Sequence, residues 1–291
     1  MRIPEDRSLG SLSMPVIMPK SMDIDIGNQF AGQFAEEFGG VVSDPYIDEY
    51  VQAVGNRVAV KQRDPDWPFE FHALNSNVIN AFALPGGKVF ITMGLLRSMG
   101  NEAQLAAVLG HECGHVSERH GMEQVQLDML TNLGRDILTE LAGDVISDEV
   151  WDTVGNSLIN LYTAGYSRDQ ESEADQRGIA AAYKAGYNPL GAVQLMELFQ
   201  SLEAEDPSIM EQLYATHPPS GERAEVMRSW IKTRYPIKPN AVIGEEQYRK
   251  AVFGEGASIA RTLTNLPIWA LVAVPIGLAA LIFLLAPSKE K

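Results

Sequence analysis

The chain has 291 residues, 45% of them apolar, which is enough for one substantial core, so we expect a single main domain. Its 23 basic and 38 acidic residues leave a net charge of −15, which argues against nucleic acid or anionic lipid as the main partner of the soluble part, and a DNA-binding function is rejected. A single cysteine, Cys113, excludes an intrachain disulfide and leaves the redox compartment open.

Two packing helices are predicted near the start of the chain. Residues 1–22 carry three prolines and several charges but no long apolar run, so they indicate a flexible lead-in without a secretory signal. Residues 23–38 predict an amphipathic helix that ends at a pair of glycines. Asp44 is the expected N-cap of a second helix, which begins at Pro45.

A small sheet is predicted next. Residues 69–74 alternate as a strand does, with His72 on the polar side, where a structural or solvent contact is the favoured role. Residues 80–93 indicate two strands around the turn at 85–87. Because the turn begins with proline, which cannot donate to a strand ladder, the strand before it is expected at a sheet edge. An extended substrate can pair with such an edge, although an ordinary buried hairpin is the alternative. The candidate substrate-binding residues are Ala81, Phe82, Ala83 and Leu84.

The segment His111-Glu112-Cys113-Gly114-His115 lies in an apolar, helix-forming context. Positions four apart lie about 40° apart around a helix, so His111 and His115 point toward one place, where they can hold a metal ion. Glu112 lies about 100° round from His111 and can contact a water at the same place. The pattern H-E-x-x-H therefore predicts two zinc ligands and a general base. Because such a pattern also arises on ordinary surface helices, a third ligand has to support it.

The residues around this motif predict how its helix is built. Asn101 and Gln104 form a capping pair at its start. Gly110 and Gly114 weaken helix propensity, and the close approach of another element would explain them. Cys113 points away from the predicted metal and is expected to be a small buried residue.

His120 is the first candidate for a third metal ligand, but its spacing is unsuitable. It lies five residues beyond His115, about 140° round a continued helix, which would carry it away from the ion. The amphipathic segments 122–141 and 145–161 contain no histidine and are predicted to be scaffold or lid helices.

A better candidate lies on a later helix. Ser167 and Gln170 form a capping box at its start. Glu171 and Asp175 are four residues apart and share a face, so one can bind the metal while the other holds the second ring nitrogen of a ligand histidine. Glu173 points elsewhere. The alternative is an ordinary solvated acidic helix.

Four separated motifs resemble those of peptidase family M48. In chain order they are residues 80–87, the segment His111 to His115, Ser167-Arg168 with Glu171 and Asp175, and His217-Pro218-Pro219 with Glu222-Arg223. The resemblance covers about residues 25–235. It implies a gluzincin-type metalloprotease domain, mainly helical α+β with a small, mostly antiparallel sheet. Zinc would be bound by His111, His115 and Glu171, with Glu112 as general base and Asp175 as partner of a ligand histidine.

Within that family, the likeness is nearest to the largely soluble BepA-like branch. The HtpX and CaaX-prenyl protease branches have several transmembrane helices, which this chain does not match. The resemblance also implies that His217 approaches the zinc as a latch or stabilises the oxyanion, and a structural hydrogen bond is the alternative. Arg223 is expected to pair with an acidic group near the cleft or to form a plain surface salt bridge.

The C-terminal part predicts a membrane anchor. The 21 residues 266–286 carry no charge and are long enough for one transmembrane helix, with a buried core helix as the alternative. The predicted organisation is therefore a lead-in at 1–22, a zinc metallopeptidase domain at 23–240, a juxtamembrane connector at 241–265, the anchor, and a short basic tail at 287–291. Flanking charges leave the orientation open, and the lack of a signal favours the cytoplasmic side.

The sequence thus predicts a membrane-tethered zinc metalloendopeptidase with one Zn²⁺ per chain. Its expected substrates are unfolded or misassembled membrane-associated proteins, so its expected role is protein quality control. The alternative is a chaperone-like protein that keeps the protease fold and binds clients with little hydrolysis. A metal-free helical adaptor is a third possibility. Substrate identity, cleavage preference and oligomeric state are left open.

Overall fold

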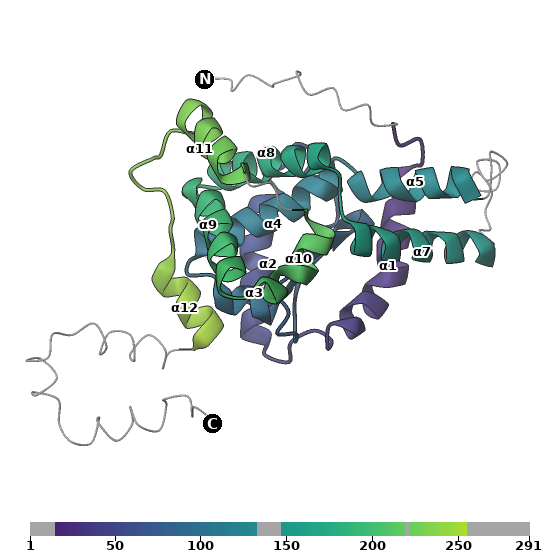
Figure 1. Ribbon diagram of the computed structural model, residues 1–291, viewed down its shortest axis with the longest axis horizontal. Helices are drawn as coiled ribbons and strands as arrows, with labels where there is room; N and C mark the ends of the chain where they lie inside the picture. Colours follow the sequence, from purple (N-terminus) through teal and green to yellow (C-terminus); the bar gives the residue numbers. More distant parts are fainter. Residues whose placement is uncertain (1–14, 133–146, 219–221, 255–291) are drawn as a thin grey trace, which may run out of the picture.

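The computed structural model describes residues 15–132, 147–218 and 222–254 (Figure 1). These residues form a mainly helical α+β fold, as the sequence predicts. In chain order the elements are α1 (Lys20–Glu37), α2 (Pro45–Ala59), β1 (Glu70–Leu74), β2 (Ala81–Leu84), η1 (Pro85–Gly87), β3 (Lys88–Thr92), α3 (Met93–Ser98), α4 (Glu102–Ser117), α5 (His120–Asn132), α7 (Asp148–Ala164), α8 (Arg168–Lys184), α9 (Leu190–Glu205), η2 (Pro207–Met210), α10 (Glu211–Thr216), α11 (Arg223–Arg234) and α12 (Glu245–Phe253).

The three-stranded sheet has the order β1-β3-β2, with β2 at an edge as predicted. The prediction of a mostly antiparallel sheet is wrong: β2 and β3 pair antiparallel, but β1 and β3 pair parallel. The chain reverses before β2 and again at the turn that follows it, so β3 runs in the direction of β1. Strand β3 takes the central position because four of its five residues are buried, and a central strand is covered on both sides.

Helix α4 lies at the centre of the fold, and nearly all of its side chains are buried. As predicted, Asn101 caps its start by accepting a hydrogen bond from the Gln104 amide at 3.0 Å. Its two glycines face α8. A Cβ on Gly110 would lie 3.0 Å from the Gly178 carbonyl oxygen, and one on Gly114 would lie 3.1 Å from Cα of Ala174. The predicted close approach is therefore confirmed, and α8 is the element that approaches.

The remaining helices surround α4 on different sides. Helices α5 and α7 pack together and project from one side of the body (Figure 1). Helix α9 packs against both α4 and α11 on another side. Residues 245–253, assigned by the sequence to a connector, instead form α12, whose buried Tyr248 donates a hydrogen bond to the Leu96 carbonyl at 2.5 Å. A tyrosine in this interior position makes α12 part of the core.

Across the described residues, we find no helix that combines the length and apolar character needed to cross a bilayer. The predicted membrane anchor at 266–286 lies outside those residues, as do residues 255–265 of the predicted connector and the tail at 287–291. The predicted lead-in extends too far: α1 already begins at Lys20, so Met22 lies within the helix, and both Met22 and Met18, just before the helix, are buried in the core.

Replacing Gly178 by alanine tests the contact between α4 and α8. Alanine favours a helix over glycine by about 1 kcal/mol, but its Cβ would lie 2.7 Å from the His111 backbone nitrogen, which cannot rotate away. We expect Gly178→Ala to lower the free energy of unfolding by about 2 kcal/mol in urea denaturation. Gly32→Ala is the control, because nothing lies within 4 Å of the added Cβ on that exposed helix position. This control should gain up to about 1 kcal/mol, and equal responses would contradict the packing argument.

Candidate metal centre

Four side chains from three parts of the chain bring their donor atoms together. His111 and His115 come from α4, Glu171 from the first turn of α8, and His217 from the end of α10. One ligand atom from each lies within 4.8 Å of the others. The Nε2 atoms of His111 and His115 are 3.0 Å apart. The Oε1 atom of Glu171 lies 3.3 Å from Nε2 of His115. The fold therefore joins the first motif to the predicted third ligand.

These distances can be compared with those around a zinc ion. Four ligand atoms at about 2.1 Å from Zn²⁺ in a tetrahedron lie about 3.4 Å from one another. Nδ1 of His217 lies 3.3 Å from Nε2 of His111 and 2.9 Å from Oε1 of Glu171. Two histidines and a glutamate are also a ligand set that zinc uses in peptidases. The residues therefore fit one zinc ion, with His217 at the fourth position.

Asp175 holds the second ring nitrogen of His111, as predicted for one of the two carboxylates on α8. Its Oδ1 atom lies 2.9 Å from Nδ1 of His111. Burial opposes a proton on the His111 ring, but the Glu171 and Asp175 carboxylates raise its pKa to about 10. Because the ligand nitrogen Nε2 must be free of its proton, metal binding has to displace the Nε2 proton, while the Nδ1 proton stays on the side of Asp175.

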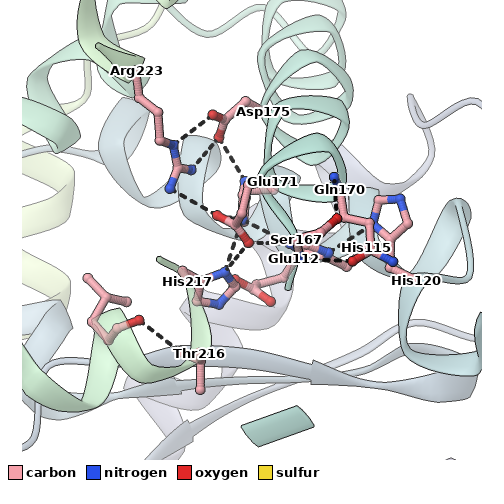
Figure 2. Close-up of polar contacts among 12 residues, drawn as sticks. Glu112, His115, His120, Ser167, Gln170, Glu171, Asp175, Thr216, His217 and Arg223 are labelled. Carbon is pink, nitrogen blue, oxygen red and sulfur yellow. Dashed lines mark hydrogen bonds and ion pairs between the residues drawn. The ribbon is translucent and has the colours of Figure 1, made fainter. Parts of the chain in front are cut away.

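Arg223 joins both carboxylates of α8 to α11. Its Nε and Nη2 atoms donate to Asp175 at 2.9 and 2.7 Å, and Nη1 lies 2.9 Å from Oε2 of Glu171 (Figure 2). Burial opposes the negative charge on Asp175, but Arg223 and His111 hold the pKa of its carboxyl below the ordinary value. Of the two expectations for Arg223, the pairing with acidic groups beside the cleft is the one observed.

Glu112 lies inside the same cluster. Its Oε1 atom is 3.5 Å from Nε2 of His217, and its Oε2 atom is buried without a hydrogen-bond partner among the described residues. Burial raises the pKa of its carboxyl. A raised pKa makes this carboxyl a stronger base than an ordinary glutamate, which suits a residue that accepts and returns a proton.

The ring of His115 makes two further contacts that the sequence analysis does not predict. Nδ1 of His115 lies 2.9 Å from Nδ1 of His120, and Tyr166 stacks on the His115 ring with centroids 3.8 Å apart. Burial lowers the pKa of His115 well below its ordinary value, so the ring is neutral, as a metal requires. From the sequence, His120 is excluded as a ligand because a continued helix would carry it away from the metal. Helix α4 instead ends at Ser117, and the turn that follows brings His120 back to the His115 ring. A local break of this kind has no clear sequence signal.

An apolar cavity of about 110 Å³ opens beside Glu112 and His217, between α4, α9, α10 and α11. Of the predicted substrate-binding strand, only Ala81 lines this cavity. Phe82, Ala83 and Leu84 line a smaller pocket that also reaches His217. The apolar residues that line the apolar cavity include Val108, Ile179, Leu195, Met196, Phe199, Leu213 and Met227.

Comparison with known proteins identifies this arrangement. Residues 45–231, more than half of the chain, match the model of peptidase family M48. The chain belongs to this family. The predicted resemblance is thus confirmed, and the cluster of three histidines and one glutamate in this M48 chain suits one Zn²⁺.

Relatives of this M48 peptidase show how far the likeness extends. A beta-barrel assembly-enhancing protease of Yersinia pestis is 28% identical over 217 residues, which are 72% of this chain and 43% of that protein. Mitochondrial metalloendopeptidase OMA1 of Schizosaccharomyces pombe is 30% identical over 183 residues, 62% of this chain and 52% of that protein. Metalloprotease YcaL of Escherichia coli is 29% identical over 209 residues, which are 72% of this chain and 76% of that protein. The chain spans less than half the length of the assembly-enhancing protease.

Replacing Asp175 by asparagine tests its contact with His111. The amide keeps an acceptor oxygen but loses the charge that Arg223 and the His111 ring face, so the ring is held less firmly. We expect Asp175→Asn to raise the Kd for zinc by about 10- to 100-fold, measured by competition with a chromogenic chelator. Asp169→Asn, at an exposed position on the same helix, is the control and should bind zinc as the wild type does. Unchanged affinity in Asp175→Asn would contradict this role.

Proposed function

We propose that this chain is a gluzincin-type zinc metalloendopeptidase that acts in quality control on unfolded or misassembled membrane-associated proteins. The observation that carries the proposal is the convergence of His111, His115 and Glu171 on one point, with the Glu112 carboxyl beside it. Two histidines and a glutamate leave a fourth position for the reactants, as a catalytic zinc site requires.

In the proposed mechanism, His111, His115 and Glu171 would hold the zinc ion, which would supply the activation of a water molecule and the polarisation of the substrate carbonyl. Glu112 takes a proton from the attacking water and later gives it to the leaving amine. Its buried carboxyl, with a raised pKa, supports both transfers. Asp175 keeps the His111 ring in place, and Arg223 keeps both carboxylates of α8 in place.

His217 has two proposed roles that follow one another. With Nδ1 among the four donor atoms, it would act as a latch on the resting site, holding the zinc as a fourth ligand until substrate arrives. When a substrate arrives, the ring moves aside, and its second nitrogen donates a hydrogen bond to the oxyanion. The approach of Nε2 to Glu112 at 3.5 Å supports a position beside the reacting groups.

The surroundings of the site support a peptide substrate. In our proposal the apolar cavity receives an apolar side chain next to the cleaved bond, and the edge strand β2 pairs with the extended chain. The relatives named for beta-barrel assembly and for mitochondria motivate the quality-control role. The apolar segment 266–286 is the proposed membrane anchor, with the cytoplasm as the proposed location of the peptidase domain.

Replacing Glu112 by glutamine tests hydrolysis directly. The amide fills the same space but cannot accept the proton, so we expect zinc content to stay at one per chain while cleavage of unfolded casein falls about 10³-fold. Zinc is measured by elemental analysis and cleavage by release of labelled peptides. Full activity of Glu112→Gln would refute the mechanism. If this inactive variant replaced the wild type in a null strain, client binding rather than hydrolysis would be the biological role.

Replacing Met196 by tryptophan tests the cavity. Met196 is partly exposed at the cavity wall, so the larger indole can fill the space without rebuilding the core. We expect kcat/KM to fall about tenfold for peptides with leucine or phenylalanine next to the cleaved bond, and to change little for peptides with alanine there. Glu197→Trp, on the exposed face of α9, is the control. An equal loss for both peptide types would contradict a side-chain pocket.

A further inference from the structure

His120 is a buried histidine for which the proposed mechanism has no use. It is 4% exposed and begins α5, directly after the metal helix. Its Nδ1 atom lies 2.9 Å from Nδ1 of His115, on the side of that ring opposite to the donor atom Nε2 (Figure 2). His120 is not among the four residues whose donor atoms converge. His120 therefore contacts the ring of the ligand His115 on the side away from the metal.

The backbone turns sharply to bring His120 there. Helix α4 ends at Ser117, and Arg119 has φ 61°, the only left-handed value among the described residues other than glycine. This conformation is strained for a residue that has a side chain. Arg119 is held in it by hydrogen bonds to Asp23 at 3.0 Å and to the Met18 carbonyl at 2.8 Å. A strained residue fixed from α1 thus determines where His120 lies.

The contact between the two rings determines where their protons lie. A metal on Nε2 of His115 leaves its single ring proton on Nδ1. A hydrogen bond needs one donor and one acceptor, so Nδ1 of His120 has to accept, and its own proton lies on Nε2. That nitrogen faces the Glu173 carboxylate at 3.7 Å.

We propose that His120 is a positioning residue that fixes the tautomer and the orientation of His115, and thereby the affinity of the site for zinc. Asp175 holds His111 by its outer nitrogen, and His120 holds His115 in the same way from the next helix. Tyr166, stacked on the His115 ring, leaves it little freedom to tilt. The inference rests on the proposed zinc site. Because it is tested by zinc binding, it can hold even if the chain cuts no peptide.

The test compares two substitutions of similar size. In His120→Asn, the side-chain oxygen takes the place of Nδ1 and still accepts from His115, whereas His120→Leu has the same shape without an acceptor. Zinc affinity is measured for the full chain by competition with a chromogenic chelator. We expect the Kd to rise about 10- to 100-fold in His120→Leu and to stay within about threefold of the wild type in His120→Asn. His72→Leu, on β1 outside the site, should leave the Kd unchanged.

A second measurement separates this role from a merely structural one. In zinc-loaded wild type and His120→Asn, proton-nitrogen NMR should show a slowly exchanging proton on Nδ1 of His115, and His120→Leu should lose that signal. Thermal unfolding of the metal-free proteins reports folding separately. Equal zinc affinities in the Leu and Asn variants, whether both normal or both weakened, would overturn the proposal. A proton signal that persists in His120→Leu would also overturn it.

Discussion

The close packing of α8 on α4 is the constraint on which the metal centre depends. Gly110, Gly114 and Gly178 let the two backbones meet where side chains would hold them apart. A helix pair separated by ordinary side chains lies 8–10 Å apart, and smaller residues bring it closer. At this separation the Glu171 carboxylate reaches the two histidines of α4. The glycines that weaken the helix are thus what allows the site to form.

The second constraint is electrostatic. Glu112, Glu171 and Asp175 are three buried carboxylates, and Arg223 is the one guanidinium that the described residues place against them. Fully ionised, this set carries two net negative charges, which one Zn²⁺ balances while the histidines stay neutral. An isolated buried charge costs several kcal/mol, so these groups stabilise one another only as a set. The same charges explain why the site fits a divalent cation.

The two sides of the centre have different surroundings. On one side, Asp175 contacts the ring of His111, and His120 and Tyr166 contact the ring of His115. Arg223 in turn holds Asp175. On the other, His217 lies at the end of the short helix α10, beside the apolar cavity. This asymmetry suits a peptidase, because the ligands have to stay in place while substrate enters. It also accounts for four donor atoms in a site that needs only three from the protein.

Local sequence patterns predict the helix from Pro45, the two helices that carry the site with their caps, and the edge strand. His111 and His115 follow from local helix geometry. A capping box and a four-residue spacing place Glu171 and Asp175 on one helix face, but the choice of Glu171 as the ligand comes from the family resemblance. Only the tertiary structure decided the parallel pairing of β1 with β3, the place of α12 in the core, and the contact of His120 with His115. The pairing of strands depends on how burial is shared across the whole sheet. The position of His120 depends on the left-handed residue Arg119, which is held by the carboxylate of Asp23, about a hundred positions earlier in the chain. Neither can be read from neighbouring residues, because the deciding contacts are made only when the chain has folded.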